Sequence, residues 1–172
     1  MKTTALEARA GKLLLEQGKT IALAESCTGG LATSLLTDVA GSSAYVLGSV
    51  VSYTNEIKAK VLGVDSEILA TEGAVSPQVA QQMAQGVRSL MGSDYGLGIT
   101  GNAGPGPSEG KPVGLVYIAI AYKDQVQVEE LHFQGSRTEN KLRIAQRALS
   151  MLIDILLLPK GNRCEEFMEE QK

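Results

Sequence analysis

Apolar and polar positions follow two periods along this chain, and segments with the two periods alternate. Residues 3–18 place leucine and alanine three or four positions apart, as on one helix face, and end at Gly18. Residues 20–25 form a short apolar run typical of a strand, and helical spacing then returns up to about Val39. The beginning of the chain therefore predicts a helix, a strand and a second helix.

The next part of the chain continues the alternation. Residues 45–54 are rich in β-branched side chains and predict a strand. A short helix is expected over 55–63, with Asn55 as its N-cap and Gly63 as its end. Another short helix is expected over 65–73. This part predicts one strand followed by two short helices.

The clearest helix signal lies at residues 76–92. Ser76 is a typical N-cap residue, Pro77 suits the first turn, and Gly92 suits the end. A short apolar run over 95–101 then predicts a buried strand.

The last part of the chain predicts a loop, a hairpin and a helix. Residues 102–112 are dense in glycine and proline, and 113–135 read as a β-hairpin turning at 123–125. A long helix is expected over 137–157. Helices that alternate with strands, followed by a hairpin, predict an α/β fold: a three-layer α/β/α sandwich with a mixed β-sheet.

We expect one domain over residues 1–158 and a charged, flexible tail over 159–172. The composition, 44% hydrophobic and 20% charged, is that of a globular protein. A net charge of -3, 4% aromatic residues and no tryptophan disfavour nucleic acid binding. The longest apolar run falls short of the roughly 18 residues of a membrane span, and charges break up the N-terminus where a signal peptide has an apolar core.

Metal and disulfide chemistry are also not expected. Cys27 and Cys164 lie far apart and form no metal-ligand spacing. We therefore expect a cytoplasmic protein without metal or cofactor, and without a nucleic acid or membrane partner.

The stretch AESCTGG places Ser26, Cys27 and Thr28 between a predicted strand and a predicted helix. A nucleophile at such a corner is exposed, and amides at the start of the helix can stabilise an oxyanion. Gly29 and Gly30 allow a substrate to approach the backbone closely. The alternative is that Ser26 or Thr28 only caps the helix.

A nucleophile at this corner requires a base. His132, the single histidine, is the candidate for a Ser-His-Asp triad, whereas a buried lysine with a lowered pKa is the other option. Tyr53, Lys58 and Lys60 surround the end of a predicted strand and the start of a helix, and a sharp turn at Asn55 brings Tyr53 and Lys58 together. The same residues also fit a capped helix with solvated lysines.

Two further segments suit an anion. The glycines of TGNAGPGPSEGKPVG, residues 100–114, can form a nest of amides for a phosphate, although neither a Walker loop nor a dinucleotide fingerprint is present. Arg137, Lys141 and Arg143 lie on the first turns of the last predicted helix, and the first two share a face. Their charge opposes the helix dipole, which a bound anion would explain. A plain surface loop and solvated charges are the alternatives.

Taken together, the chain resembles the CinA C-terminal-domain family, whose stand-alone members include nicotinamide mononucleotide amidases. The resemblance covers about residues 5–158 and rests on several colinear motifs. These are AESCTGG, AGSSAYVLGSVVSYTNEIKAKVLGV, GAVS, ITGNAGP with KPVG, and GSR followed by NKLR.

The resemblance implies a three-layer α/β/α fold that hydrolyses the carboxamide of nicotinamide mononucleotide to nicotinate mononucleotide and ammonia. By this resemblance Ser26 is the nucleophile, Lys58 activates it, Tyr53 belongs to the same site, and Thr100 places a hydroxyl facing it. The implied substrate-binding positions, including amides that hold the oxyanion, are Cys27, Thr28, Gly29, Gly30, Gly101, Asn102, Gly104, Arg137 and Lys141. Asn102 stands where the family usually has an apolar residue.

Other functions stay open at this level. The same cleft can belong to a nucleotide-binding module without catalysis, and Cys27 is an alternative nucleophile. We expect a homodimer, because two-fold assemblies are common and the family forms them. Longer family members carry an amino-terminal pyrophosphatase-like domain, and we expect its activity to be absent here.

Overall fold

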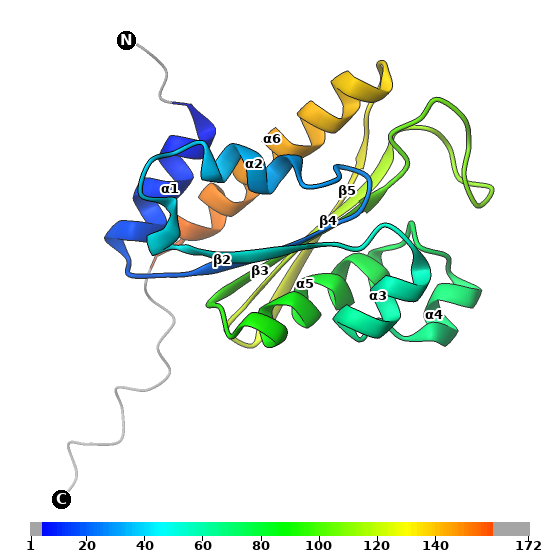
Figure 1. Ribbon diagram of the computed structural model, residues 1–172. Helices are drawn as coiled ribbons and strands as arrows, with labels where there is room; N and C mark the ends of the chain where they lie inside the picture. The colour runs from blue at the N-terminus through cyan, green and yellow to red at the C-terminus, as the bar shows by residue number, and fades with distance from the viewer. Residues whose placement is uncertain (1–4, 160–172) are drawn as a thin grey trace, which may run out of the picture.

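The computed structural model describes residues 5–159, which form a twisted sheet between two groups of helices (Figure 1). The helices are α1 (Leu6–Glu16), α2 (Leu31–Thr37), α3 (Asn55–Leu62), α4 (Ser66–Thr71), α5 (Pro77–Met91) and α6 (Arg137–Leu156), with a short 3₁₀ helix, η1, at Ser42–Ala44. The strands are β1 (Ile21–Glu25), β2 (Val46–Val51), β3 (Tyr95–Gly101), β4 (Leu115–Tyr122) and β5 (Gln125–His132).

The five strands form one mixed sheet in the order β2-β1-β3-β4-β5. Strand β1 runs parallel to both β2 and β3, whereas β4 runs antiparallel to β3 and to β5. The β4–β5 connection is a tight hairpin turn in which Lys123 has a positive φ of 50°. The predicted mixed sheet is confirmed.

Helices cover both faces of the sheet. Figure 1 shows α1, α2 and α6 on one face and α3, α4 and α5 on the other. Alternate side chains of β4 point to opposite faces of the sheet. Ile118 and Ile120 belong to the hydrophobic core under α1, α2 and α6, whereas Ala119 belongs to the apolar cluster under α5. Close packing of α5 requires a glycine in β3, because a Cβ at Gly98 would lie 2.5 Å from the Ala80 carbonyl oxygen.

The topology creates a crevice at one edge of the sheet. Because β1, β2 and β3 are parallel, their carboxyl ends meet at the same edge. The chain leaves β1 toward α2 on one face, whereas it leaves β3 into the loop 102–114. Ligands of open α/β sheets bind where the chain diverges in this way. The crevice lies at Ser26, which follows β1 directly.

Several predicted boundaries differ from the structure. Thr54, and not Asn55, caps α3: its hydroxyl accepts a hydrogen bond from the Ile57 amide at 3.3 Å, which leaves Asn55 as the first helical residue. The helix expected to run to Val39 ends at Thr37, and strand β2 covers only the centre of the predicted run 45–54.

The predicted caps Ser76 and Gly92 of α5 are confirmed. The predicted tail 159–172, beyond Pro159, lies outside the described residues, as does Cys164. Within residues 5–159, no helix is both long and apolar enough to cross a membrane.

Candidate active site

The side chains of Ser26 and Lys58 meet in the crevice. Lys58 lies in α3, 32 positions after Ser26, and its Nζ donates a hydrogen bond to the Ser26 Oγ at 2.9 Å. The same Nζ donates to the Ser52 carbonyl oxygen at 2.7 Å. Two acceptors from two strand ends therefore fix the amine beside the hydroxyl.

Lys58 is buried to an unusual degree for a lysine. Only 1% of the residue is exposed, and within residues 5–159 no carboxylate lies within salt-bridge distance of its Nζ. Burial lowers the pKa of the Lys58 amine below its ordinary value of 10.5. The charge of Glu109, and that of the Cys27 thiolate where it forms at high pH, oppose part of this lowering. An amine held in this way is available as a base at a lower pH than a solvated lysine.

A buried carboxylate that the sequence interpretation missed holds the Ser26 turn in shape. Glu25 is fully buried, and its carboxylate accepts bonds from the Thr28 hydroxyl at 2.6 Å and from both the amide and the hydroxyl of Thr33, at 2.8 and 2.7 Å. It also accepts from the amides of Gly30 and Ala32. The carboxylate thus takes the place of a helix N-cap. An acidic residue at the end of an apolar strand, just before a helix start, was the available signal.

This network changes the role of three predicted binding residues. Thr28 is fully buried with its hydroxyl on Glu25, and the Gly30 amide donates to the same carboxylate. The Gly29 amide donates to the Ser26 carbonyl oxygen at 3.1 Å. Thr28, Gly29 and Gly30 do not line the cleft. The positive φ angles of Gly29 and Gly30, together with these hydrogen bonds, shape the turn instead.

Cys27 lines the cleft beside Ser26, but its thiol is unreactive. Its residue is 6% exposed, and burial raises the pKa of the thiol to about 12. A thiol with this pKa is protonated at neutral pH and is a poor nucleophile. Within residues 5–159 the Cys27 amide donates to no backbone carbonyl oxygen, although a hydrogen bond from this amide to the Cys27 thiol opposes part of the rise in the pKa of the thiol. It is the backbone donor next to Ser26 that no carbonyl oxygen uses.

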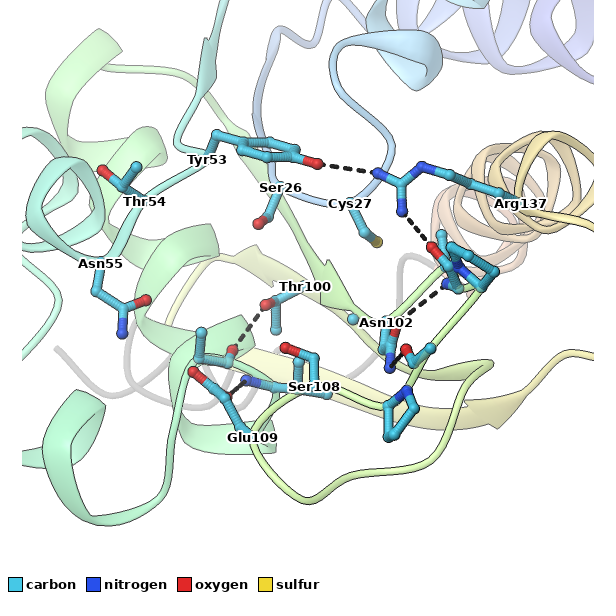
Figure 2. A pocket seen from close by; sticks show the side chains of 18 of the residues that line it. Ser26, Cys27, Tyr53, Thr54, Asn55, Thr100, Asn102, Ser108, Glu109 and Arg137 are labelled. Carbon is cyan, nitrogen blue, oxygen red and sulfur yellow. Dashed lines mark hydrogen bonds between the residues drawn. The ribbon is translucent and has the colours of Figure 1, made fainter.

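Tyr53 and Arg137 form one wall of the cleft (Figure 2). The Arg137 Nη2 donates to the Tyr53 Oη at 2.9 Å, and Nη1 donates to the Gly104 carbonyl oxygen at 2.6 Å. Tyr53 itself is 60% exposed and lines the cleft. The side chain at the start of α6 thereby links the β2–α3 segment to the glycine-rich loop.

Thr100 and Asn102 form the floor and the adjoining loop. Thr100 is 1% exposed, and its hydroxyl donates to the Ala74 carbonyl oxygen at 2.7 Å. The Asn102 side chain accepts from the Gly104 amide at 2.9 Å and donates to the Gly106 carbonyl oxygen at 2.9 Å. Asn102 therefore folds the loop on itself, a role that an apolar residue cannot fill.

The cleft has a volume of about 460 Å³ and brings together nine of the predicted site residues. Those that line it are Ser26, Cys27, Tyr53, Lys58, Thr100, Gly101, Asn102 and Gly104, together with Arg137. Lys141 does not line it: its Nζ lies 3.6 Å from the position a Cβ would take on Gly29. His132 is also outside, exposed on β5 and 3.0 Å from the Glu130 carboxylate, so it cannot serve Ser26.

The arrangement supplies the parts of nucleophilic catalysis without histidine. It combines a hydroxyl, a buried amine and, next to the hydroxyl, a backbone amide that no carbonyl oxygen uses. Among residues 5–159, no group of three or more histidine, cysteine, aspartate and glutamate side chains is placed to hold a metal ion.

Comparisons with known sequences identify the family. The CinA C-terminal domain model matches residues 3–156. A competence-damage inducible protein of Moorella thermoacetica is 52% identical over 148 residues, which cover 86% of this chain and 36% of that protein. A CinA-like protein of Trichodesmium erythraeum is 51% identical over 148 residues, covering 85% and 34%. The chain thus spans about a third of the length of these relatives.

Solved structures agree with the sequence comparisons. A CinA superfamily protein from Klebsiella pneumoniae superposes with a TM-score of 0.86 at 33% identity, covering 88% of this chain and 95% of that chain. The competence/damage inducible protein CihA from Agrobacterium tumefaciens gives a TM-score of 0.83 at 40% identity, covering 90% and 98%. The chain belongs to the CinA C-terminal domain family.

Proposed function

We propose that this chain is an amidohydrolase that converts nicotinamide mononucleotide to nicotinate mononucleotide and ammonia by a Ser-Lys mechanism. The observation that carries the proposal is the 2.9 Å contact between the buried Lys58 Nζ and the Ser26 Oγ. A surface lysine stays protonated at neutral pH, whereas burial moves the pKa of Lys58 toward the range of a general base.

The proposed reaction has two halves. Ser26 Oγ attacks the carboxamide carbon, and its proton passes to the neutral Lys58 amine. The tetrahedral intermediate collapses as Lys58 returns that proton to the leaving nitrogen, which departs as ammonia. Water then attacks the acyl-enzyme with Lys58 again as base, and nicotinate mononucleotide leaves as Ser26 is restored.

Backbone and side-chain donors support the intermediate in this proposal. In this proposal the oxyanion accepts a hydrogen bond from the amide of Cys27, the residue after the nucleophile, and the absence of a backbone acceptor for this amide within residues 5–159 supports that role. Arg137 keeps N–H groups beyond the two that bind Tyr53 and Gly104, so it can also bind the phosphate of the substrate.

The test is ammonia release from nicotinamide mononucleotide by the purified chain, with Ser26→Ala as the control. Thermal-shift binding of the same compound separates the enzyme from a nucleotide-binding module without catalysis. Binding by the parent without any ammonia release favours the module and overturns the amidase. We also propose a homodimer, which light scattering on the same sample tests.

A further inference from the structure

One charged residue in the cleft has no part in the proposed chemistry. The charged side chains that line the cleft are Lys58, Arg137 and Glu109. Lys58 and Arg137 have roles in the reaction and in phosphate binding, whereas Glu109 has none. It lies in the loop 102–114, which lines the cleft.

Glu109 is held in a defined position although it is exposed. Its backbone adopts a φ of 52°, and its Oε2 accepts a hydrogen bond from the Val75 amide at 3.3 Å. The carboxylate lies against Gly73, where a Cβ would stand 2.6 Å from Oε2. Lys111 fastens the same loop, because its Nζ donates to the carbonyl oxygens of Glu72 and Val75.

Because Glu109 and Arg137 lie apart in the cleft, one side of the cleft is anionic and the other is cationic. Figure 2 shows Arg137 and Glu109 on opposite sides, with Ser26 and Thr100 between them. The charge of Glu109 reaches into the site, because it raises the pKa of Lys58 against the larger lowering by burial. When Lys58 is neutral, as the mechanism requires, one guanidinium and one carboxylate remain to face a ligand.

Such a cleft is complementary to a zwitterion. Nicotinamide mononucleotide carries a phosphate anion at one end, while its pyridinium nitrogen gives the ring bearing the carboxamide a positive charge. The ribose and the carboxamide are meta substituents of this ring. In the pose that we infer, the phosphate meets Arg137 and the carboxamide meets Ser26, while the ring between them turns toward Glu109. The hydrogen bond from Val75 uses one oxygen, so the carboxylate keeps capacity for a cation.

We propose that Glu109 is a specificity residue that recognises the cationic ring of the substrate and favours pyridinium nucleotides over neutral ones. This inference rests on the proposed amidase function. A reduced, dihydropyridine form of the same nucleotide keeps the carboxamide, ribose and phosphate but lacks the ring charge. It is therefore the matched probe.

The experiment measures binding of both nucleotides by calorimetry, with all variants in the Ser26→Ala background so that no turnover occurs. Glu109→Gln keeps an acceptor for the Val75 amide and removes only the charge. We expect it to weaken binding of the cationic nucleotide on the order of fivefold, the upper range for an exposed ion pair, and to leave the reduced nucleotide unchanged. Lys111→Met loosens the loop and also removes a cation that lies near the Glu109 carboxylate. It should therefore weaken the reduced nucleotide at least as much as the cationic one, the opposite order to Glu109→Gln.

The outcomes separate this inference from the proposed function. Equal loss on both nucleotides in Glu109→Gln, or no loss on either, overturns the charge role of Glu109 while ammonia release by the parent still supports the amidase. If the parent neither binds nor hydrolyses nicotinamide mononucleotide, both proposals fail together.

Discussion

The Lys58 Nζ lies 2.9 Å from the Ser26 Oγ and 2.7 Å from the Ser52 carbonyl oxygen, inside a pocket that leaves 1% of the lysine exposed. A neutral amine has two N–H groups and one lone pair. One N–H can stay on the Ser52 carbonyl oxygen, which leaves the lone pair free to turn toward the serine proton. The geometry thus holds the base in place before the substrate arrives.

Ser26→Ala should abolish ammonia release while the protein stays folded, because losing a covalent nucleophile costs several orders of magnitude in rate. Cys27→Ala is the neighbouring control and should keep most of the activity, since burial keeps the Cys27 thiol protonated. Steady-state rates of the two variants decide the point. An active Ser26→Ala together with an inactive Cys27→Ala would assign the reaction to the thiol.

The rate should rise with pH as Lys58 loses its proton. Burial lowers the pKa of Lys58 below 10.5, so the neutral amine appears at lower pH than in a solvated lysine. We expect kcat/KM to rise with pH through a single ionisation whose midpoint lies below 10.5. A pH–rate profile measures this midpoint, and one at or above 10.5 contradicts the role of Lys58 as base.

The same pKa shift predicts a pH-dependent stability. Between the lowered folded pKa of Lys58 and its unfolded value of 10.5, the unfolded chain binds one proton more, so the stability of the parent rises with pH. The Lys58→Met variant has no amine at this position, so its unfolded chain does not bind the extra proton. In that window the parent should gain stability relative to Lys58→Met by at most about 1.4 kcal/mol per pH unit. Urea unfolding at several pH values tests this; a constant difference would contradict it.

The order of helices and strands could be predicted from periodicity, because each element carries its own spacing and its own end signals. Ser76 and Gly92, for example, mark both ends of α5. The N-cap of α3 was misplaced by one residue, because Thr54 and Asn55 both favour that position and only the Ile57 amide distinguishes them.

The site was less predictable where its residues act through contacts between distant elements. Ser26 and Lys58 are 32 positions apart, and only the parallel pairing of β1 and β2 makes their meeting evident. From their spacing of four, Lys141 and Arg137 were predicted to bind the same phosphate. In the structure Lys141 lies one helical turn after Arg137, outside the cleft lining and near Gly29. Glu25 was missed because its partners lie on the following helix turn.

Glu25→Gln should destabilise the protein strongly. The carboxylate accepts five hydrogen bonds from donors in the Ser26 turn and the start of α2, and a glutamine would turn an NH₂ group toward some of them. Buried donors left without an acceptor should cost about 3 kcal/mol, or roughly 6–12 °C in Tm. Thermal unfolding measures the loss.

Glu139→Gln is the matched control for Glu25. Glu139 also accepts from donors at a helix start, the amide and hydroxyl of Ser136, but it is exposed, so water can replace the lost bonds. Its Tm should fall by less than half as much as that of Glu25→Gln. Equal decreases in Tm for the two variants would show that the burial of the Glu25 hydrogen bonds does not increase their contribution to stability.

The final prediction concerns the choice between nicotinamide mononucleotide and its riboside, which lacks the phosphate. Arg137 lines the cleft with its guanidinium fixed by Tyr53 and Gly104, whereas Lys141 lies outside the lining. Charge-assisted hydrogen bonds to a phosphate contribute roughly 1.5–3 kcal/mol each, so Arg137→Ala should raise KM for the mononucleotide about tenfold to a hundredfold. Lys141→Ala should raise it much less, and the riboside should be a poor substrate that neither substitution alters. Steady-state kinetics of the parent and both variants on the two compounds test this. A loss on the riboside equal to that on the mononucleotide would mean that Arg137 acts by holding Tyr53 and the glycine-rich loop, and not by binding the phosphate.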